Sequence, residues 1–563
     1  MSTSSPTDDA PGASASRRTF LRAAGAVALG AALPAPAAAW VRPRAARADL
    51  VIRGGTVFDG TGAEGRELDV ALSGGRIEAI GRRLAAGAEE IDARGLTVAP
   101  GFVDIHSHAD GTLFADPAAE SVIRQGVTTV VVGQDGGSPA PRAGGGEDGE
   151  GDGRHASLGA WFAAVERLPA AVNVACMIGL GTVRQATIGL DDRPATPDEL
   201  RRMTALVERA LADGACGASS GLEYTPGAFA SRAELVALCR PLAARRLPYA
   251  THMRNEDDRL LDAITEAIAV AEGAGCPLQI SHLKTQGPRN WGRLDDAFAT
   301  IERAAARGVD VAFDRDPYVA YQTGLTNLFP VWSRDGGTAA FLARLDDAAT
   351  APRIRAETLA KVELIGGWDN VQVTSVSADE DRRAEGQRLG AFARAAGSDP
   401  YEAAVGLLRR SRGSVGMVGF AMSEENLERI LAHPRGMVCS DGAAVAVVGP
   451  ARRGHPHPRS LGTFARVLGR YVRERRALTL AQAVHKMSGL PARRLRLDGR
   501  GTIARGNAAD LVVFDAAAVT DRATFAEPFQ YPDGIAAVIV NGTVALRDGQ
   551  RAAARSGRAV RRG

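Results

Sequence analysis

Two histidines one residue apart, His106 and His108, end an apolar run that begins at Gly101. Residues i and i+2 of a β-strand point to the same face, so both imidazoles project from one strand end. Imidazoles that converge on one point are common ligands of divalent metal ions. The pair therefore predicts half of a metal site, provided that the rest of the chain supplies further ligands.

Further ligand types end apolar runs later in the chain. His252 closes residues 248–252, His282 closes residues 278–282, and Asp441 follows residues 437–440. If these runs are strands of one sheet, four histidines and one aspartate meet at a single edge. Such a set indicates a metal site, and zinc suits a histidine-rich set best.

These apolar runs belong to a longer alternation of strand and helix patterns. Eight strand candidates lie at residues 101–106, 128–133, 172–178, 215–220, 248–252, 278–282, 309–313 and 437–440. One of the intervening helices begins clearly, with Thr196 as cap, Pro197 in the first turn and Glu199 closing a capping box. The pattern predicts an α/β chain in which residues 101–499 form a (β/α)8 TIM-type barrel, with its chemistry at the carboxyl ends of the strands.

Short strands and glycine turns fill the chain on both sides of the barrel pattern. Residues 49–100 and 500–563 each look like an incomplete sheet, so we expect one small discontinuous β-sandwich domain that carries the barrel as an insertion. The connection between the last two barrel strands is far longer than one helix, which predicts a lid insertion around residues 318–400. Residues 139–153 are rich in glycine and acid and predict a mobile loop.

The composition excludes several classes of protein. Hydrophobic residues make up 45% and charged residues 24%, as in ordinary globular proteins. The sequence contains no uninterrupted apolar span of about 20 residues, so no transmembrane helix is expected. Residues 1–48 hold six arginines and two acidic residues, which leaves 62 basic and 63 acidic residues elsewhere. This balance does not suggest a nucleic-acid partner. The five scattered cysteines are expected to be buried thiols rather than disulfides.

The first 48 residues resemble an export signal. Arg17 and Arg18 precede a weakly apolar run at residues 23–32, and small residues at 37–39 and 46–48 offer two cleavage sites. The pattern is similar to a twin-arginine signal peptide. We therefore expect the protein to use the twin-arginine export machinery and to reside in the periplasm or outside the cell.

Several motifs surround the expected ligands. They are the stretches 99–108, 219–227, 252–254, 281–284 and 440–442, together with His457-Pro458-Arg459 and residues 462–464. In these stretches the chain resembles the amidohydrolase superfamily, and within it the N-acyl-D-amino-acid deacylases. The resemblance covers essentially the whole chain after residue 48.

The resemblance implies a metal-dependent amide hydrolase with one or two Zn2+ ions. Water bound to such an ion has a pKa of about 7, and the resulting hydroxide would attack the amide. Asp441 is implied as both metal ligand and general base, which passes the proton to the leaving nitrogen. The side chains implied around the carboxylate of a small-molecule substrate are Lys284, Arg459 and either Tyr318 or Tyr321. Tyr224 would assist the oxyanion or pack in the wall.

One position departs from the family pattern. The deacylases carry an Asn-Cys-Gly-Phe-Ser stretch whose thiolate binds metal, whereas this chain has Gln134-Asp135-Gly136-Gly137-Ser138. The chain also has no lysine at the fourth strand, the position from which a carbamylated lysine bridges two metal ions in many members of the superfamily. Two cations that share a site need an anion between them. Glu223 and Asp135 are the two candidates for a bridging metal ligand, and the sequence favours Glu223.

Three functional classes remain after this reading. The first is a hydrolase of N-acyl-D-amino acids, and its close alternative is a D-configured dipeptidase. The second is a cyclic-amide hydrolase of the hydantoinase or dihydroorotase type, against which the His457-Pro458-Arg459 stretch argues. The third is a metal-binding protein without catalysis, against which Asp441 argues.

The signal pattern makes a testable prediction about export. Replacing both Arg17 and Arg18 with lysine should trap uncleaved precursor in the cytoplasm, because the arginine pair is the feature that the export machinery reads. Immunoblots of cytoplasmic and exported fractions would measure this. Unchanged export of the double variant would refute the assignment.

Overall fold

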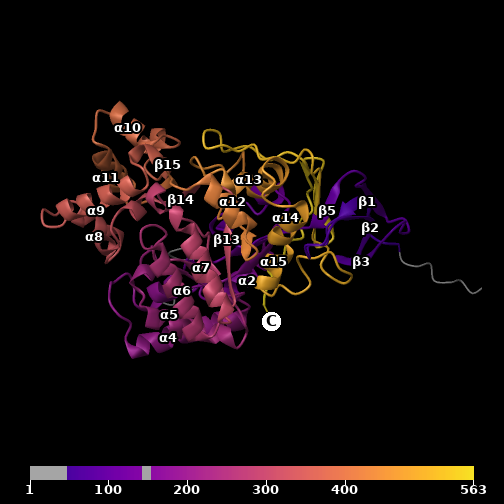
Figure 1. Ribbon diagram of the computed structural model, residues 1–563, viewed down its shortest axis with the longest axis horizontal. Helices are drawn as coiled ribbons and strands as arrows, with labels where there is room; N and C mark the ends of the chain where they lie inside the picture. Colours follow the sequence, from indigo (N-terminus) through magenta and orange to yellow (C-terminus); the bar gives the residue numbers. More distant parts are fainter. Residues whose placement is uncertain (1–46, 143–153, 563) are drawn as a thin grey trace, which may run out of the picture. The chain divides into compact units, whose positions relative to one another are not determined.

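The computed structural model describes residues 47–142 and 154–562 (Figure 1). The predicted export signal falls almost entirely outside these residues, and so does most of the predicted mobile loop at 139–153. No helix in the described ranges is long and apolar enough to cross a membrane. All five cysteines are buried free thiols, as predicted.

Parallel strands carry the predicted ligands. One sheet contains β6 (Phe102–Asp104), β7 (Val127–Val132) and β8 (Asn173–Cys176), and a second contains β9 (Ile178–Gly179), β10 (Ala218–Gly221), β11 (Tyr249–His252), β12 (Leu278–Ile280), β13 (Val311–Arg315) and β17 (Gly436–Val438). Only Met177 separates β8 from β9. A parallel bridge between Ser107 and Gly442 joins the other ends of the two sheets. Followed from β6 through β8 and β9 to β17 and across this bridge, the strands therefore lead back to the end of β6.

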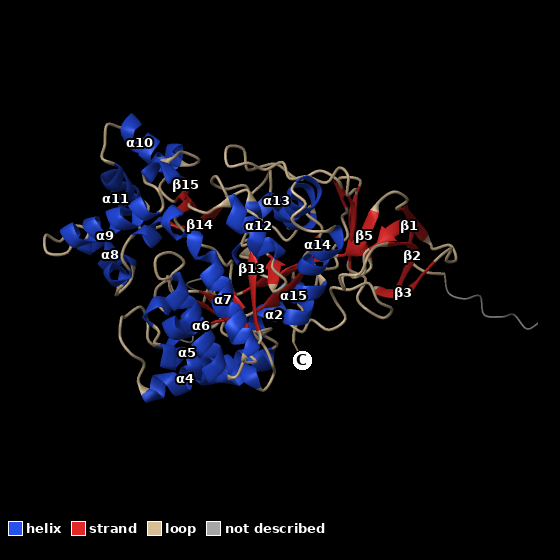
Figure 2. Cartoon of the chain, in the orientation of Figure 1, coloured by secondary structure: helices blue, strands red, loops and turns tan. Residues whose placement is uncertain are grey.

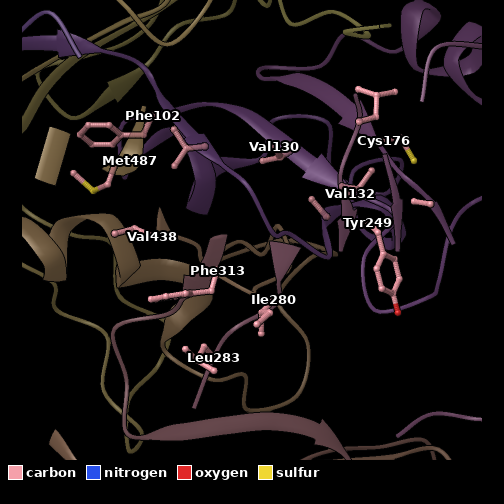
Figure 3. Packing of buried hydrophobic residues seen from close by; sticks show 14 of the residues in the cluster. Phe102, Val130, Val132, Cys176, Tyr249, Ile280, Leu283, Phe313, Val438 and Met487 are labelled. Carbon is pink, nitrogen blue, oxygen red and sulfur yellow. The ribbon is translucent and has the colours of Figure 1, made fainter. Parts of the chain in front are cut away.

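Amphipathic helices alternate with these strands (Figure 2). Helices α4 (Pro197–Asp213), α5 (Arg232–Ala243), α6 (Leu260–Ala274) and α7 (Leu294–Ala306) follow one another along the chain. Helix α4 starts with the predicted capping box, in which the Thr196 and Glu199 side chains bind each other's backbone amides. The apolar side chains between strands and helices form one large buried cluster that includes Val130, Ile280 and Phe313 (Figure 3).

Strands from both ends of the chain share another sheet. It contains β1 (Leu50–Val57), β2 (Arg66–Ser73), β3 (Arg76–Gly81), β4 (Glu89–Asp92) and β5 (Thr97–Pro100), together with β18 (Leu511–Phe514), β19 (Ile535–Val540), β20 (Thr543–Arg547) and β21 (Gln550–Arg551). The antiparallel pair β5–β18 joins the two sets. Because β6 begins two residues after β5, this pair fixes where the chain enters the parallel strands.

A separate unit lies between β13 and β17. It contains the antiparallel strands β14 (Ala320–Gly324), β15 (Val371–Val376) and β16 (Val415–Phe420) with helices α8 (Thr338–Arg344), α9 (Ala351–Leu364), α10 (Leu389–Ala395) and α11 (Pro400–Arg410). We call residues 318–420 the insertion. It has its own apolar cluster and extends beyond residue 400, because β16 is the central strand of its sheet.

The shared sheet supports a stability prediction. Ile539 in β19 is fully buried and faces Leu511 of β18, so Ile539→Ala should destabilise the protein by about 2–5 kcal/mol through lost burial and a residual cavity. Thermal unfolding would measure the loss. Val448→Ala is the matched control, because that side chain is 74% exposed. Equal unfolding midpoints for the two variants would contradict the tight packing of β19 in the shared sheet.

Candidate active site

The carboxyl ends of the parallel strands open into a cavity of about 720 Å³. Its walls include most of the residues singled out from the sequence: His108, Asp135, Glu223, Tyr224, His252, His282, Lys284, Asp441 and Arg459. His106 lies beneath them with 1% of its surface exposed. The fold thus brings together side chains that are more than 330 positions apart in the sequence.

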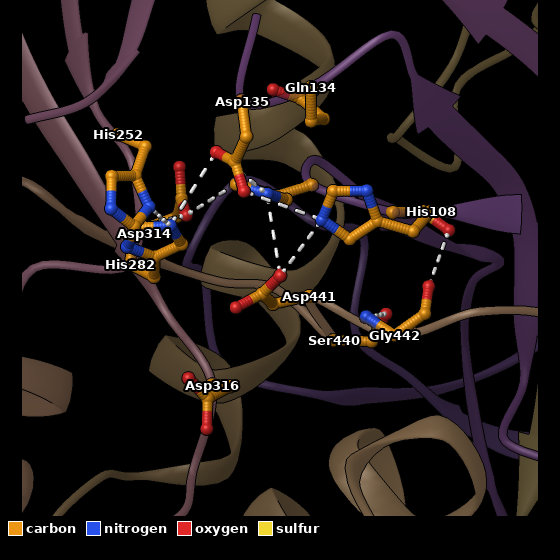
Figure 4. Close-up of polar contacts among 12 residues, drawn as sticks. His108, Gln134, Asp135, His252, His282, Asp314, Asp316, Ser440, Asp441 and Gly442 are labelled. Carbon is orange, nitrogen blue, oxygen red and sulfur yellow. Dashed lines mark hydrogen bonds and ion pairs between the residues drawn. The ribbon is translucent and has the colours of Figure 1, made fainter. Parts of the chain in front are cut away.

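The first group of possible metal ligands surrounds the Asp135 carboxylate (Figure 4). His106 Nε2 lies 3.4 Å from Asp135 Oδ1, and His108 Nε2 lies 3.4 Å from Asp135 Oδ2. Asp441 Oδ1 completes the group, 3.1 Å from His108 Nε2 and 3.5 Å from His106 Nε2. Two imidazoles and two carboxylates therefore converge on one point.

The second group shares Asp135 with the first. It consists of Asp135, His252 and His282. His282 Nε2 lies 3.5 Å from Asp135 Oδ1, and His252 Nδ1 lies 3.0 Å from His282 Nε2. Asp135 is thus common to both groups, which is the position required of a bridging ligand.

Glu223, which the sequence favoured as the bridge, lies on the outer side of the second group. Its Oε2 is 3.4 Å from His252 Nε2, the ring nitrogen that faces away from His282. The difference comes from backbone packing, because a Cβ on Gly136 would lie 2.6 Å from the amide nitrogen of Gly221. This approach brings Asp135 over the end of β10, while Glu223 lies behind His252. The geometry therefore favours Asp135 over Glu223.

Backbone conformation also marks the ligands. Asp135, His282 and Asp441 have φ values of 51°, 36° and 50°, in the left-handed region that side chains other than glycine rarely adopt. Local hydrogen bonds hold two of them there. The His282 amide donates to Asp314 Oδ1 at 2.8 Å, and the Asp441 amide donates to the His106 carbonyl at 2.9 Å. Such strain collects at functional sites.

In three of the histidines, the ring nitrogen that faces away from the ligand groups lies next to a carboxylate. His106 Nδ1 lies 3.5 Å from Asp314, His252 Nε2 lies 3.4 Å from Glu223, and His282 Nδ1 lies 3.0 Å from Glu256. Carboxylates in this position orient metal-binding imidazoles. Asp314 and Glu256 were not predicted from the sequence. Asp314 directly follows the apolar residues 311–313 of β13, a pattern like that of the predicted ligands, whereas Glu256 lies in a loop without such a pattern.

The residues expected around a substrate carboxylate have partners of their own. Lys284 Nζ donates to both Glu256 oxygens at 2.7 Å and lies 2.7 Å from His282 Nδ1. Arg459 Nη1 donates to Asp441 Oδ2 at 2.6 Å, while its Nε is buried and bonds to no described residue. Both cations reach the cavity, and the Arg459 Nε–H remains as a donor.

The expected tyrosines fall in different places. The Tyr224 ring lies 4.6 Å from the His252 ring, and its hydroxyl accepts a hydrogen bond from Thr323 at 3.2 Å. Tyr318 lies outside the cavity, packed against His457. Tyr321 lines the cavity instead. The turn between β13 and β14 sets this register, and the sequence alone left it open.

The carboxylates of the site stay ionised. Burial opposes ionisation of Asp135, but the imidazoles of His106 and His282 hold its pKa well below the usual range. Burial likewise opposes ionisation of Asp441, and Arg459 and His106 hold its pKa well below the usual range. The His108 pKa rises to about 9 despite burial, because Asp135 and Asp441 are close. Both carboxylates are therefore present in the charged form that binds a cation.

The donor set fits divalent cations. His106 Nε2, the nitrogen that faces the first ligand group, and Asp135 Oδ1 are buried and make no hydrogen bond to any described residue. Buried polar atoms without partners are costly, so a ligand is expected to satisfy them. Imidazole nitrogens with carboxylate oxygens are typical zinc ligands. The two groups that share Asp135 can hold one or two such ions.

A family model described as the amidohydrolase family matches residues 89–546. The chain belongs to this family. An N-acyl-D-glutamate deacylase of Alcaligenes xylosoxydans xylosoxydans is 39% identical over 88% of this amidohydrolase and 93% of its own length. An N-acyl-D-aspartate deacylase of the same organism is 38% identical, over 90% and 94%.

The solved structures that resemble this chain include deacylases of the same kind. An N-acyl-D-glutamate deacylase from Bordetella bronchiseptica, complexed with zinc and a phosphonate inhibitor, has a TM-score of 0.78 and 36% identity. The match covers 92% of this amidohydrolase and all of that chain. The mixed α/β fold and the predicted resemblance to N-acyl-D-amino-acid deacylases are therefore confirmed.

The position of Asp135 predicts how metal content responds to substitution. Asp135→Asn should lose at least one bound ion, because its carboxylate serves both ligand groups. Glu223→Gln should keep its ions with about 10–100-fold weaker affinity, since Glu223 only supports His252. Elemental analysis after dialysis would compare the two isosteric variants. Full metal content in Asp135→Asn, with loss in Glu223→Gln, would restore Glu223 as the bridge.

Proposed function

We propose that this amidohydrolase removes the acyl group from N-acyl-D-amino acids by metal-dependent hydrolysis of the amide bond. The observation that carries the proposal is the cavity, in which the histidine and aspartate ligand groups face the same space as Lys284 and Arg459. An amide that bears a neighbouring carboxylate is the substrate that such a pairing suits. The deacylase relatives support the same reaction.

We propose that the cofactor is one or two zinc ions. Asp135, which both ligand groups share, would hold them together with His106, His108, His252, His282 and Asp441. One solved relative is described with zinc, and another as having a binuclear metal centre. When bound, the ions polarise the scissile carbonyl and acidify water.

Asp441 is the proposed general base. Its Oδ2 is held by Arg459 at 2.6 Å, which leaves Oδ1 facing the ligand groups and the cavity. Because Asp441 is ionised, its carboxylate can take a proton from the attacking water and deliver it to the amide nitrogen as that nitrogen leaves. The products are the free D-amino acid and the carboxylate of the acyl group.

Substrate orientation is assigned to three side chains. Arg459 offers its buried Nε–H to the substrate carboxylate, and Lys284 adds positive charge beside it. Tyr321 replaces Tyr318 as the third member, because it lines the cavity. Tyr224, against His252, is proposed to face the developing oxyanion. These cations would favour a substrate with a free carboxylate.

The same proposal extends to the architecture and location of the protein. The closed path of parallel strands is interpreted as a (β/α)8 barrel over residues 101–499, set within a β-domain made of residues 49–100 and 500–563. The insertion is interpreted as a lid, since Tyr321, Thr323 and Asn327 line the cavity. Export through the twin-arginine route, to the periplasm or beyond, rests on Arg17 and Arg18.

A substrate panel with one active-site variant tests the proposal. N-acetyl-D-amino acids should be hydrolysed, whereas N-acetyl-L-amino acids, D-dipeptides and hydantoins should be poorer substrates. Asp441→Asn should reduce turnover by about 10²–10⁴-fold, because the proton acceptor is removed while the shape remains. Asp295→Asn is the control, since its side chain is 77% exposed. Faster hydrolysis of hydantoins, or near-normal turnover by Asp441→Asn, would refute it.

A further inference from the structure

A third group of possible ligands lies beside the other two. Glu223, His252 and Glu256 offer atoms within 4.8 Å of one another, although the protein supplies cations there itself. Lys284 donates to both oxygens of Glu256, and Lys361 approaches Glu223. The chain has only three lysines among its 68 basic residues, and two of them meet at this group.

Lys361 reaches this group from the insertion. It lies on α9, and its Nζ forms an ion pair with Asp257 and lies 4.0 Å from Glu223 Oε1. The contact is shielded from water, because the Lys361, Asp257 and Glu223 side chains are 20%, 5% and 9% exposed. A compact ammonium ion with three donors can serve two carboxylates from different segments.

Two more residues of the insertion hold the same glutamate. Asn327 Nδ2 donates to Glu223 Oε2 at 3.3 Å, and Arg334 Nη2 donates to the Glu223 carbonyl at 3.0 Å. The insertion therefore holds Glu223 by hydrogen bonds at its backbone and at Oε2, and it places the Lys361 ammonium 4.0 Å from Oε1. Glu223 in turn lies 3.4 Å from His252 Nε2, opposite the Nδ1 atom that faces the second ligand group.

We propose that Lys361 is a positioning residue that acts on the metal site through Glu223. Its ammonium fixes the Glu223 carboxylate, and that carboxylate orients the His252 ring toward Asp135 and His282. Metal affinity then depends on the insertion being seated against the strands. This inference rests on the proposed function only in taking His252 as a metal ligand.

Zinc titration of the apoprotein against a chelating dye tests the inference without any substrate. Lys361→Met should weaken zinc binding by about 10–100-fold, the range typical of groups that orient a metal ligand. Arg353→Met is the matched control on the same helix, because its ion pair with Glu357 is exposed. It should leave the affinity unchanged. A failed substrate panel would refute the proposed function and leave this result standing.

Two double variants separate positioning from a general loss of stability. If Lys361 acts through Glu223, Lys361→Met in the Glu223→Gln background should weaken zinc binding no further than Glu223→Gln alone. Lys361→Met with Asp257→Asn removes both charges of the ion pair and should restore folding if the single variant fails, yet still bind zinc weakly. Unchanged affinity in Lys361→Met, additive losses with Glu223→Gln, or full affinity in the Asp257→Asn double variant would overturn the proposal.

Discussion

The charge of the Asp135 carboxylate, buried between two groups of imidazoles, is the constraint on which the catalytic end depends. Other buried acids nearby have a cation of the protein's own: Asp441 has Arg459, Glu256 has Lys284, and Asp257 has Lys361. Within the described residues, Asp135 has ion pairs only with imidazoles. A buried carboxylate without such compensation is costly. An external cation beside Asp135 would therefore stabilise this buried carboxylate.

The fold holds that carboxylate in place by means that lie far apart in the sequence. Gly136 packs on Gly221, which sets the position of Asp135 over β10. The β5–β18 pair fixes the entry into β6 and so the position of His106, while the bridge at Gly442 brings Asp441 beside it. The insertion then closes one wall through Glu223. All of these contacts are needed, because they bring ligands from distant parts of the chain around the one carboxylate that both ligand groups share.

The sequence predicted the parts of the site that depend on strand ends. His106, His108, His252, His282 and Asp441 all follow apolar runs; the last four line the cavity, and His106 lies beneath it. The choice between Asp135 and Glu223 was not accessible, because it depends on contact between two glycines and on a left-handed backbone. The choice between Tyr318 and Tyr321 stayed open because it depends on the turn between β13 and β14. The role of Lys361 was not predicted from the sequence, because its partners Glu223 and Asp257 are distant in the chain.

The exchange of a thiolate for a carboxylate has consequences that follow from the ligand atoms. The family pattern that the sequence resembles implies a thiolate in the place of Asp135, and sulfur is a soft ligand that favours soft metal ions such as zinc. A carboxylate is harder and offers two oxygens, and here Oδ1 faces His106 and His282 while Oδ2 faces His108. Selectivity must then come from the geometry of the imidazoles. This places more weight on Asp314, Glu223 and Glu256, the carboxylates that orient the rings, than a thiolate site would require.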